Sequence, residues 1–210
     1  MLDLLIIFVK ILIMSLIGNI EITQEQKEIL FGTLLGDGNL RYNDSGKSVF
    51  GRMNHSASQE EYIKYKQSNL ANLTSNVKSY KAKAGLKYYD SLYFTFKSNI
   101  QLNSLYHVFY DVNGKKHIPD DLSLLTPRAM AFWFMDDGTA SNPTIKIATC
   151  CFSMSDLLRL QTFLSEQYGI DTVITGERKL YFKAKTKKIF KTLVDPYIIE
   201  SMRYKLKFIK

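Results

Sequence analysis

Two apolar segments of the chain end in the same way, and this repeat constrains the fold more than any other feature. Residues 27–35 run into Gly36-Asp37-Gly38, and residues 129–135 run into Asp136-Asp137-Gly138. Asp37 and Asp137 are 100 residues apart in a chain of 210. A period of nearly half the chain predicts two similar halves, each opening with an apolar helix that ends at an aspartate.

Helix-start signals precede both segments. Thr23 with Gln26 three residues later matches a capping box, in which each side chain accepts a hydrogen bond from the other residue's backbone N–H. Thr126-Pro127 places a capping hydroxyl before a proline in the first helical turn. The gap between the small Gly32 and Gly36 is one helical turn, so we expect the two helices to pack closely and to bring the two aspartates together.

The same order of elements follows each apolar helix, and it predicts an α+β fold. Two pseudo-symmetric α-β-β-α-β-β-α halves are expected, with antiparallel sheets. In the first half the expected elements are strand 48–56, helix 58–73, strands within 77–97 and helix 100–112; in the second they are strand 144–152, helix 153–168, strands 171–175 and 179–185, and helix 186–194.

The domain boundaries follow from this repeat. We assign residues 21–112 to the first half, 113–125 to a linker with glycine, proline and aspartates, and 126–210 to the second half. Residues 1–20 are expected to be an apolar extension outside the domain. Asp3 and Lys10 interrupt its apolar run, which is also shorter than the ~20 residues that a membrane-spanning helix needs.

Charge and cysteine content narrow the class of protein. The formal net charge is +8, and residues 179–210 alone carry ten Lys and Arg against two acids. A basic cluster of Lys78, Lys81, Lys83 and Lys87 lies in the first half. Such clusters attract nucleic acid first and an anionic membrane second. The adjacent Cys150 and Cys151 match no zinc spacing, and we interpret them as buried reduced thiols.

Alternation along the strands places polar residues on one face of each sheet. A curved sheet with basic, amide and tyrosine side chains on its outer face can follow a duplex and reach base edges in the major groove. The residues that we predict to contact DNA are Arg41, Arg52, Asn54, Ser56, Lys146, Lys179, Tyr181, Lys183 and Lys185. Together the outer faces are expected to form a DNA-binding saddle.

Two carboxylates at neighbouring helix ends repel each other and the negative ends of the helix dipoles. A divalent cation removes this conflict. Hard oxygen ligands without a Cys/His cluster favour Mg²⁺, with Mn²⁺ as a substitute, and Mg²⁺ beside a basic DNA surface suits phosphodiester hydrolysis.

The two segments resemble a known pair of motifs. Residues 30–38 (LFGTLLGDG) and 130–138 (MAFWFMDDG) look like the signature helices of a single-chain LAGLIDADG homing endonuclease. Further similarity lies in residues 115–119, Pro196-Tyr197 and residues 204–206, and the layout is most similar to intron-encoded members of the yeast omega-intron type. The second motif has Phe132 opposite Gly32 and Asp136 opposite Gly36, so the helices cannot pack as identical copies.

The resemblance implies roles for individual residues. Asp37 and Asp137 correspond to the catalytic metal ligands, with the carbonyls of Gly36 and Asp136 beside them, and Lys116 and Lys205 correspond to basic residues near the attacking water. It implies Mg²⁺-dependent cleavage of both strands of a long, asymmetric DNA site, leaving 3′ overhangs and promoting intron mobility.

Alternatives remain open at this stage. An RNA maturase that assists group I intron splicing would have intron RNA as its partner, and a DNA-binding regulator would not cleave. We expect a monomer without an obligate protein partner. Abundant Lys, Ile, Asn and Tyr suit an AT-rich organellar gene, which favours the interior of an organelle, a mitochondrion over a chloroplast.

Overall fold

The computed structural model describes residues 21–43, 48–97, 100–141 and 144–207. Residues 1–20 lie outside these ranges, so their assignment to an extension stays a prediction. In the ranges that are described, no helix is long and apolar enough to cross a membrane.

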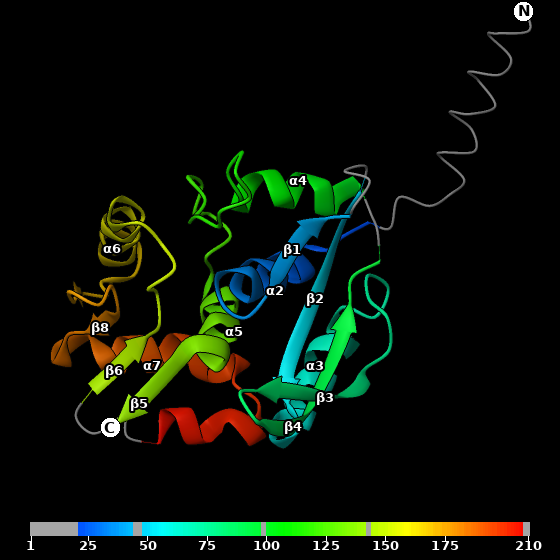
Figure 1. Cartoon of the computed structure of the whole chain (residues 1–210). Helices are drawn as coiled ribbons and strands as arrows, with labels where there is room; N and C mark the ends of the chain where they lie inside the picture. The colour runs from blue at the N-terminus through cyan, green and yellow to red at the C-terminus, as the bar shows by residue number, and fades with distance from the viewer. Residues whose placement is uncertain (1–20, 44–47, 98–99, 142–143, 208–210) are drawn as a thin grey trace, which may run out of the picture.

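Both halves have the expected order α-β-β-α-β-β-α (Figure 1). The first half consists of α2 (Gln24–Leu35), β1 (Asn39–Tyr42), β2 (Val49–Ser56), α3 (Glu60–Asn69), β3 (Lys78–Ala84), β4 (Lys87–Thr95) and α4 (Ile100–Phe109). The second consists of α5 (Pro127–Asp137), β5 (Gly138–Ser141), β6 (Thr144–Ile147), α6 (Met154–Tyr168), β7 (Thr172–Ile174), β8 (Leu180–Phe182) and α7 (Lys187–Val194), followed by 3₁₀ turns Asp195–Tyr197 and Glu200–Leu206.

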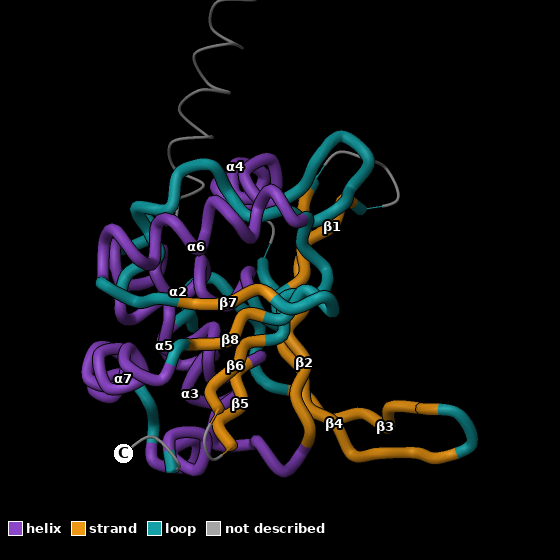
Figure 2. The backbone as a smooth tube through the Cα atoms, turned by 90° about the vertical axis from the view of Figure 1, so that its left-hand side faces the viewer, coloured by secondary structure: helices purple, strands orange, loops and turns teal. Residues whose placement is uncertain are grey.

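Each half contributes one antiparallel sheet of four strands with the same topology. The strand orders are β1-β2-β4-β3 and β5-β6-β8-β7. The strands lie on one side of the molecule, and α2, α5, α6 and α7 lie on the other (Figure 2). The predicted fold class is therefore confirmed.

The helices α2 and α5 pack side by side at the centre. A Cβ atom on Gly32 would lie 2.0 Å from the carbonyl oxygen of Ala129, so only glycine permits this approach. All residues from Ile29 to Leu35 and from Ala129 to Met135 are buried, because each helix contacts its partner on one side and its own half on the other. The capping box at Thr23 and the side-chain cap at Thr126 are both present, as predicted.

Several element boundaries differ from the prediction. Strands β1 and β5 follow directly after the two helices and were not expected as separate elements, since four residues show too little alternation. Helix α3 ends at Asn69, whose side-chain amide donates to the carbonyl oxygen of Tyr65. The strand expected over 144–152 ends at Ile147, and a turn closed by Phe152 N–H and Thr149 O follows.

The interpretation of the cysteines was half wrong. Cys150 and Cys151 are both free, as expected, but both are exposed rather than buried. They lie in the turn between β6 and α6, where the segment was predicted to continue as a half-buried strand.

Candidate active site and nucleic-acid interface

The two aspartates meet where the central helices end. Asp37 follows Gly36, the C-cap of α2, and Asp137 is the last residue of α5. Burial, followed by the nearby charges of Asp37 and Asp136, raises the pKa of Asp137 to about 7 from its ordinary value of 3.8. Burial and the charge of Asp136 also raise the pKa of Asp37. The Asp37 side chain is 42% exposed and Asp137 is half-buried, so the site brings negative charges together with only partial solvation. A cation would relieve their repulsion.

Two lysines hold the helix ends in matching ways. The Nζ of Lys116 donates to the carbonyl oxygens of Gly36 at 3.1 Å and Gly38 at 2.7 Å. The Nζ of Lys205 donates to the carbonyl oxygens of Met135 at 2.5 Å and Asp136 at 2.9 Å. Burial lowers the pKa of both ammonium groups, and the nearby carboxylates oppose this shift. Both lysines thus sit beside the acids, as their motif positions implied.

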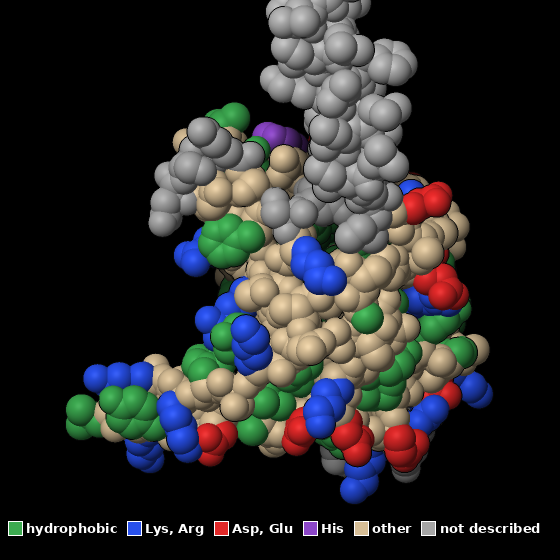
Figure 3. Space-filling view, turned by 90° about the vertical axis from the view of Figure 1, so that its right-hand side faces the viewer, with side chains coloured by type: hydrophobic (Ala, Val, Ile, Leu, Met, Phe, Trp, Pro, Cys, Tyr) green, Lys and Arg blue, Asp and Glu red, His purple; other side chains and the backbone are tan. Residues whose placement is uncertain are grey.

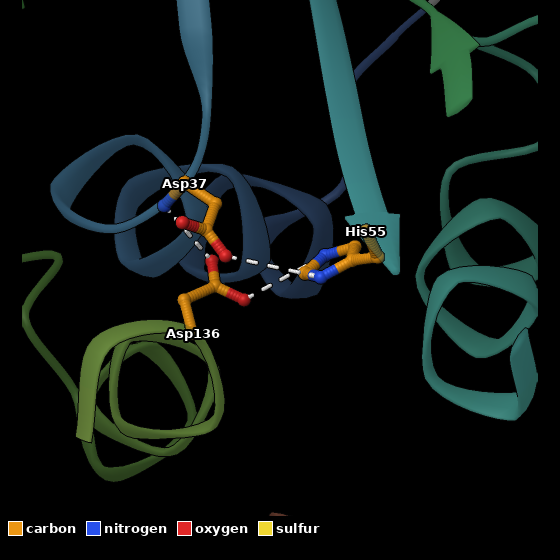
Figure 4. A group of neighbouring side chains, drawn as sticks. All are labelled: Asp37, His55 and Asp136. Carbon is orange, nitrogen blue, oxygen red and sulfur yellow. Dashed lines mark hydrogen bonds and ion pairs between the residues drawn. The ribbon is translucent and has the colours of Figure 1, made fainter. Parts of the chain in front are cut away.

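The carboxylate of Asp136 points away from its own helix into the first half (Figure 4). Its Oδ1 accepts from the Nζ of Lys66 at 2.5 Å and from the hydroxyl of Tyr62 at 2.7 Å. Its Oδ2 accepts from the backbone N–H of Asp37 at 3.3 Å. The side chains of Lys66 and Asp136 are both completely buried.

His55 completes this cluster from strand β2. Its ring nitrogens lie 3.8 Å from an oxygen of Asp37 and 3.9 Å from one of Asp136. Burial, and secondly the charge of Lys66, lowers the pKa of His55 to about 4, so the ring is neutral at pH 7. The three residues could together hold a metal ion. However, the ammonium group of Lys66 already neutralises Asp136, and a hard cation prefers an all-oxygen set.

The outer face of the first sheet carries the four residues that were predicted there. Arg41, Arg52, Asn54 and Ser56 alternate with buried residues along β1 and β2. The guanidinium of Arg52 contacts the rings of both Tyr80 and Tyr93, 4.5 and 3.8 Å from their centroids, and these two rings meet edge to face. Arg41 lies over the ring of Phe50. These aromatic contacts hold both arginines on the outer face of the sheet.

The second sheet supports only part of the predicted face. Lys146 on β6 and Tyr181 on β8 are directly opposite in register, with the ammonium 5.8 Å from the ring centroid. Strand β8 ends at Phe182, so Lys179, Lys183 and Lys185 do not share a strand face with Tyr181 as predicted. Chain reversal starts at Lys183, because the hydroxyl of Thr186 donates to its carbonyl oxygen and to that of Asp171.

Two of these three lysines also have acidic partners. Lys185 pairs with Asp171 at 2.7 Å, and Lys179 pairs with Glu177. Lys183 is exposed at the end of β8.

The basic cluster of the first half lies on the protruding hairpin of β3 and β4 (Figure 3). The register places Lys78 and Lys87 on one face, with Tyr80 and Tyr93, and Lys81 and Lys83 on the other. Lys81 pairs with Asp90 at 2.6 Å. Only half of this cluster therefore faces the saddle, which we define as the combined outer faces of the two sheets.

A family model described as the LAGLIDADG DNA endonuclease family matches residues 27–191. The chain belongs to this family. The match spans both central helices and both sheets.

Known relatives include proteins with two different descriptions. Cytochrome b mRNA maturase bI2 of Saccharomyces cerevisiae is 33% identical over 195 residues, which cover 85% of this chain and 46% of the relative. DNA endonuclease I-ChuI of Chlamydomonas applanata is 28% identical over 211 residues, covering 88% of this chain and 95% of the relative. The chain thus spans about half the length of the maturase.

A solved structure shares the LAGLIDADG fold. The homing endonuclease I-WcaI bound to its DNA recognition sequence superposes with a TM-score of 0.79 at 25% identity, and the match covers 88% of this chain and 87% of that one.

Sequence reasoning missed the residues that surround Asp136. Tyr62, Ile63 and Lys66 are spaced as one face of a helix and are all buried. The position of Lys66 on an apolar helix face indicated that it is buried. A buried lysine requires a partner such as a carboxylate. His55 alternates with the exposed Asn54 and Ser56, so its inward direction was also predictable.

Proposed function

We propose that the protein is a site-specific homing endonuclease that makes a double-strand break in a long, asymmetric DNA target and so promotes intron mobility. The arrangement of Asp37 and Asp137 supports this proposal most directly. They lie at two adjoining helix ends, each held by a lysine, between two sheets with basic and aromatic outer faces.

A divalent cation fits the donor set at this point. Asp37 and Asp137 would hold it, with the carbonyl oxygens of Gly36 and Asp136 beside them. Each carbonyl accepts one lysine hydrogen bond and keeps a second lone pair. The charge of Asp37 raises the pKa of Asp137, and a bound cation would relieve this repulsion between the two carboxylates. We propose Mg²⁺, with Mn²⁺ as a substitute; when bound, it would activate water and neutralise charge on the phosphate.

Lys116 and Lys205 would act on the scissile phosphates, one for each strand. Their ammonium groups are fixed by backbone carbonyls and are partly buried, so they can offset charge that develops on the phosphate without reorganising. The neutral ring of His55 would not compete with them as a cation.

We propose double-stranded DNA as the partner and a monomer as the active form, since one chain supplies both halves of the saddle. The I-WcaI complex with its recognition sequence supports this. The yeast cytochrome b mRNA maturase among the relatives supports an organelle interior, and we propose a mitochondrion over a chloroplast.

The second candidate is an RNA maturase that assists group I intron splicing. The 33% identity to the yeast maturase favours it. Both functions could use the same basic saddle, but only the endonuclease requires the paired acids.

Cleavage of a plasmid library of intron-less alleles would test the proposal. Mg²⁺-dependent linearisation at one site, lost with Asp37→Asn, would support an endonuclease. A chain that accelerates intron splicing but leaves every plasmid intact would instead support the maturase.

A further inference from the structure

The position before the catalytic aspartate differs between the two helices, and only one of them can carry a side chain there. A Cβ atom on Gly36 would lie 2.6 Å from the Cβ of Asp136 and 2.8 Å from its Oδ2. Glycine on α2 thus makes room for the aspartate of α5. The departure from symmetry is built into the helix contact.

Asp136 is held by an ion pair whose two charged groups lose their hydration on burial. Lys66 and Asp136 are both fully buried, and their ion pair of 2.5 Å lies among apolar side chains such as Met53. Apolar residues of similar volume are often as stabilising as a buried ion pair. Stability alone therefore does not account for the pair.

The network makes a direct hydrogen bond to the backbone of Asp37, whereas it reaches the helix of Asp137 at the carbonyl oxygen of Phe132, which accepts from Tyr62. Asp136 Oδ2 accepts from the backbone N–H of Asp37, and Tyr62 and Lys66 fix the other oxygen. For Asp137, the equivalent support would have to come from residue 36, which is glycine and has no side chain.

We propose that the buried Lys66–Asp136 pair positions Asp37 but not Asp137, so that cleavage of one DNA strand depends on the pair more than cleavage of the other. This inference rests on the proposed endonuclease function. Lys66 and Tyr62 are positioning residues here, because they act through Asp136 and do not reach the DNA themselves.

Strand-specific single-turnover cleavage tests the proposal. The target duplex is labelled on each strand, and the rates are measured for Tyr62→Phe and for the double variant Lys66→Met with Asp136→Asn, which removes both charges together. We expect the ratio of the two strand rates to change by about tenfold or more in the double variant, with a smaller change of the same sense in Tyr62→Phe. Nicked DNA should accumulate.

Lys64→Met is the matched control. Lys64 lies on the same helix but is exposed and pairs with Glu60, so its loss should leave the strand ratio unchanged. Equal slowing of both strands, or no change in either, would overturn the proposal. If the double variant does not fold, Tyr62→Phe, which removes a single hydroxyl group, decides the outcome.

A second measurement does not depend on cleavage. In the NMR spectrum of the metal-free chain, Tyr62→Phe should shift the backbone amide of Asp37 more than that of Asp137, and Lys64→Met should shift neither. Equal shifts would contradict selective positioning. If wild-type protein cuts neither strand, the proposed function fails, while the amide shifts still test the network.

Discussion

The two halves are alike at their central helices, α2 and α5, and differ in the length of their outer strands. In the first half β3 and β4 have seven and nine residues and project as a long hairpin, whereas β7 and β8 have three each (Figure 2). By contrast, Asp37 follows the C-cap of α2, Asp137 is the last residue of α5, and a lysine holds each of these helix ends. Apart from the difference between Gly36 and Asp136, symmetry is kept where the proposed chemistry is duplicated. It is relaxed where an asymmetric duplex would be read.

Neutralising either aspartate tests whether the two centres are equivalent. Asp37→Asn and Asp137→Asn should each reduce double-strand cleavage in Mg²⁺ by about 10³-fold or more, because each would remove a proposed metal ligand. Duplex binding, measured by electrophoretic mobility shift, should persist. Asp120→Asn, whose side chain is 97% exposed, should cut normally. Full cleavage by either site variant would refute the assignment.

Substituting Lys116 or Lys205 tests in a second way whether the two proposed centres are equivalent. Lys116→Met and Lys205→Met should each slow the chemical step by about 10²-fold at saturating enzyme, with one strand nicked preferentially in each case. The exposed neighbours provide matched controls, Lys115→Met and Lys207→Met. Variants that lose affinity yet cut at the normal rate once bound would leave only a phosphate-contact role.

Substitutions on the saddle test the difference between the sheets. Arg52→Ala should relax base preference at one position by about 1–3 kcal/mol, since contacts with two tyrosine rings hold its guanidinium on the outer face of the sheet. Lys146→Ala should weaken binding to all sequences and lower the salt dependence by ~1 in log–log slope.

Lys81→Ala is the control for both saddle variants, because Lys81 faces away from the saddle and pairs with Asp90. If alanine at both Arg52 and Lys183 left affinity unchanged at moderate salt, the DNA surface would have to lie elsewhere.

The raised pKa of Asp137 predicts a pH-dependent stability without metal. The folded protein holds this proton up to about pH 7, whereas an ordinary carboxyl group releases it near 3.8. The contribution of this group to stability is therefore fully present below pH 3.8 and is lost as the pH rises through 7. At pH 8, Asp137→Asn should be more stable than wild type by about 1–2 kcal/mol, and at pH 4 the two should be similar.

Thermal unfolding across this pH range, with chelator present, measures the effect. Asp171→Asn should show the opposite trend, because the hydrogen bond from Lys185 lowers the pKa of Asp171. A flat difference between wild type and Asp137→Asn would contradict the raised pKa.

The smallest effect is expected from shortening the chain at its start. The capping box at Thr23 satisfies the first turn of α2 without any upstream residue. A chain beginning at Gly18 should therefore bind and cut like the full chain, as measured in the same assays. Loss of solubility or activity would show that the apolar segment packs on one of the halves.

The sequence predicted the repeated features best. Both caps, the order of elements and the packing of the two central helices follow from local signals that occur twice. Strand β8 was predicted too long because Lys183 and Lys185 continue the alternation, although the tertiary contact between Thr186 and Asp171 turns the chain.

Periodicity indicates that Lys66 and His55 face inward, but it does not identify the residues that they meet. The partner of Lys66, Asp136, lies 70 residues away on the other half. Similarly, the stacking of Arg52 depends on Tyr80 and Tyr93, which reach it only through the pairing of β2 with β4 and of β4 with β3.

Under the proposed function, the close approach at Gly32 would also set the distance between the two cuts on the DNA. If each half acts on one strand, the spacing between the two cuts is set by how near α2 can come to Ala129. The stagger of the product ends would then be a constant of helix packing, independent of the target sequence. Evolution could retune the saddle for new targets, but every target would be cut with the same offset.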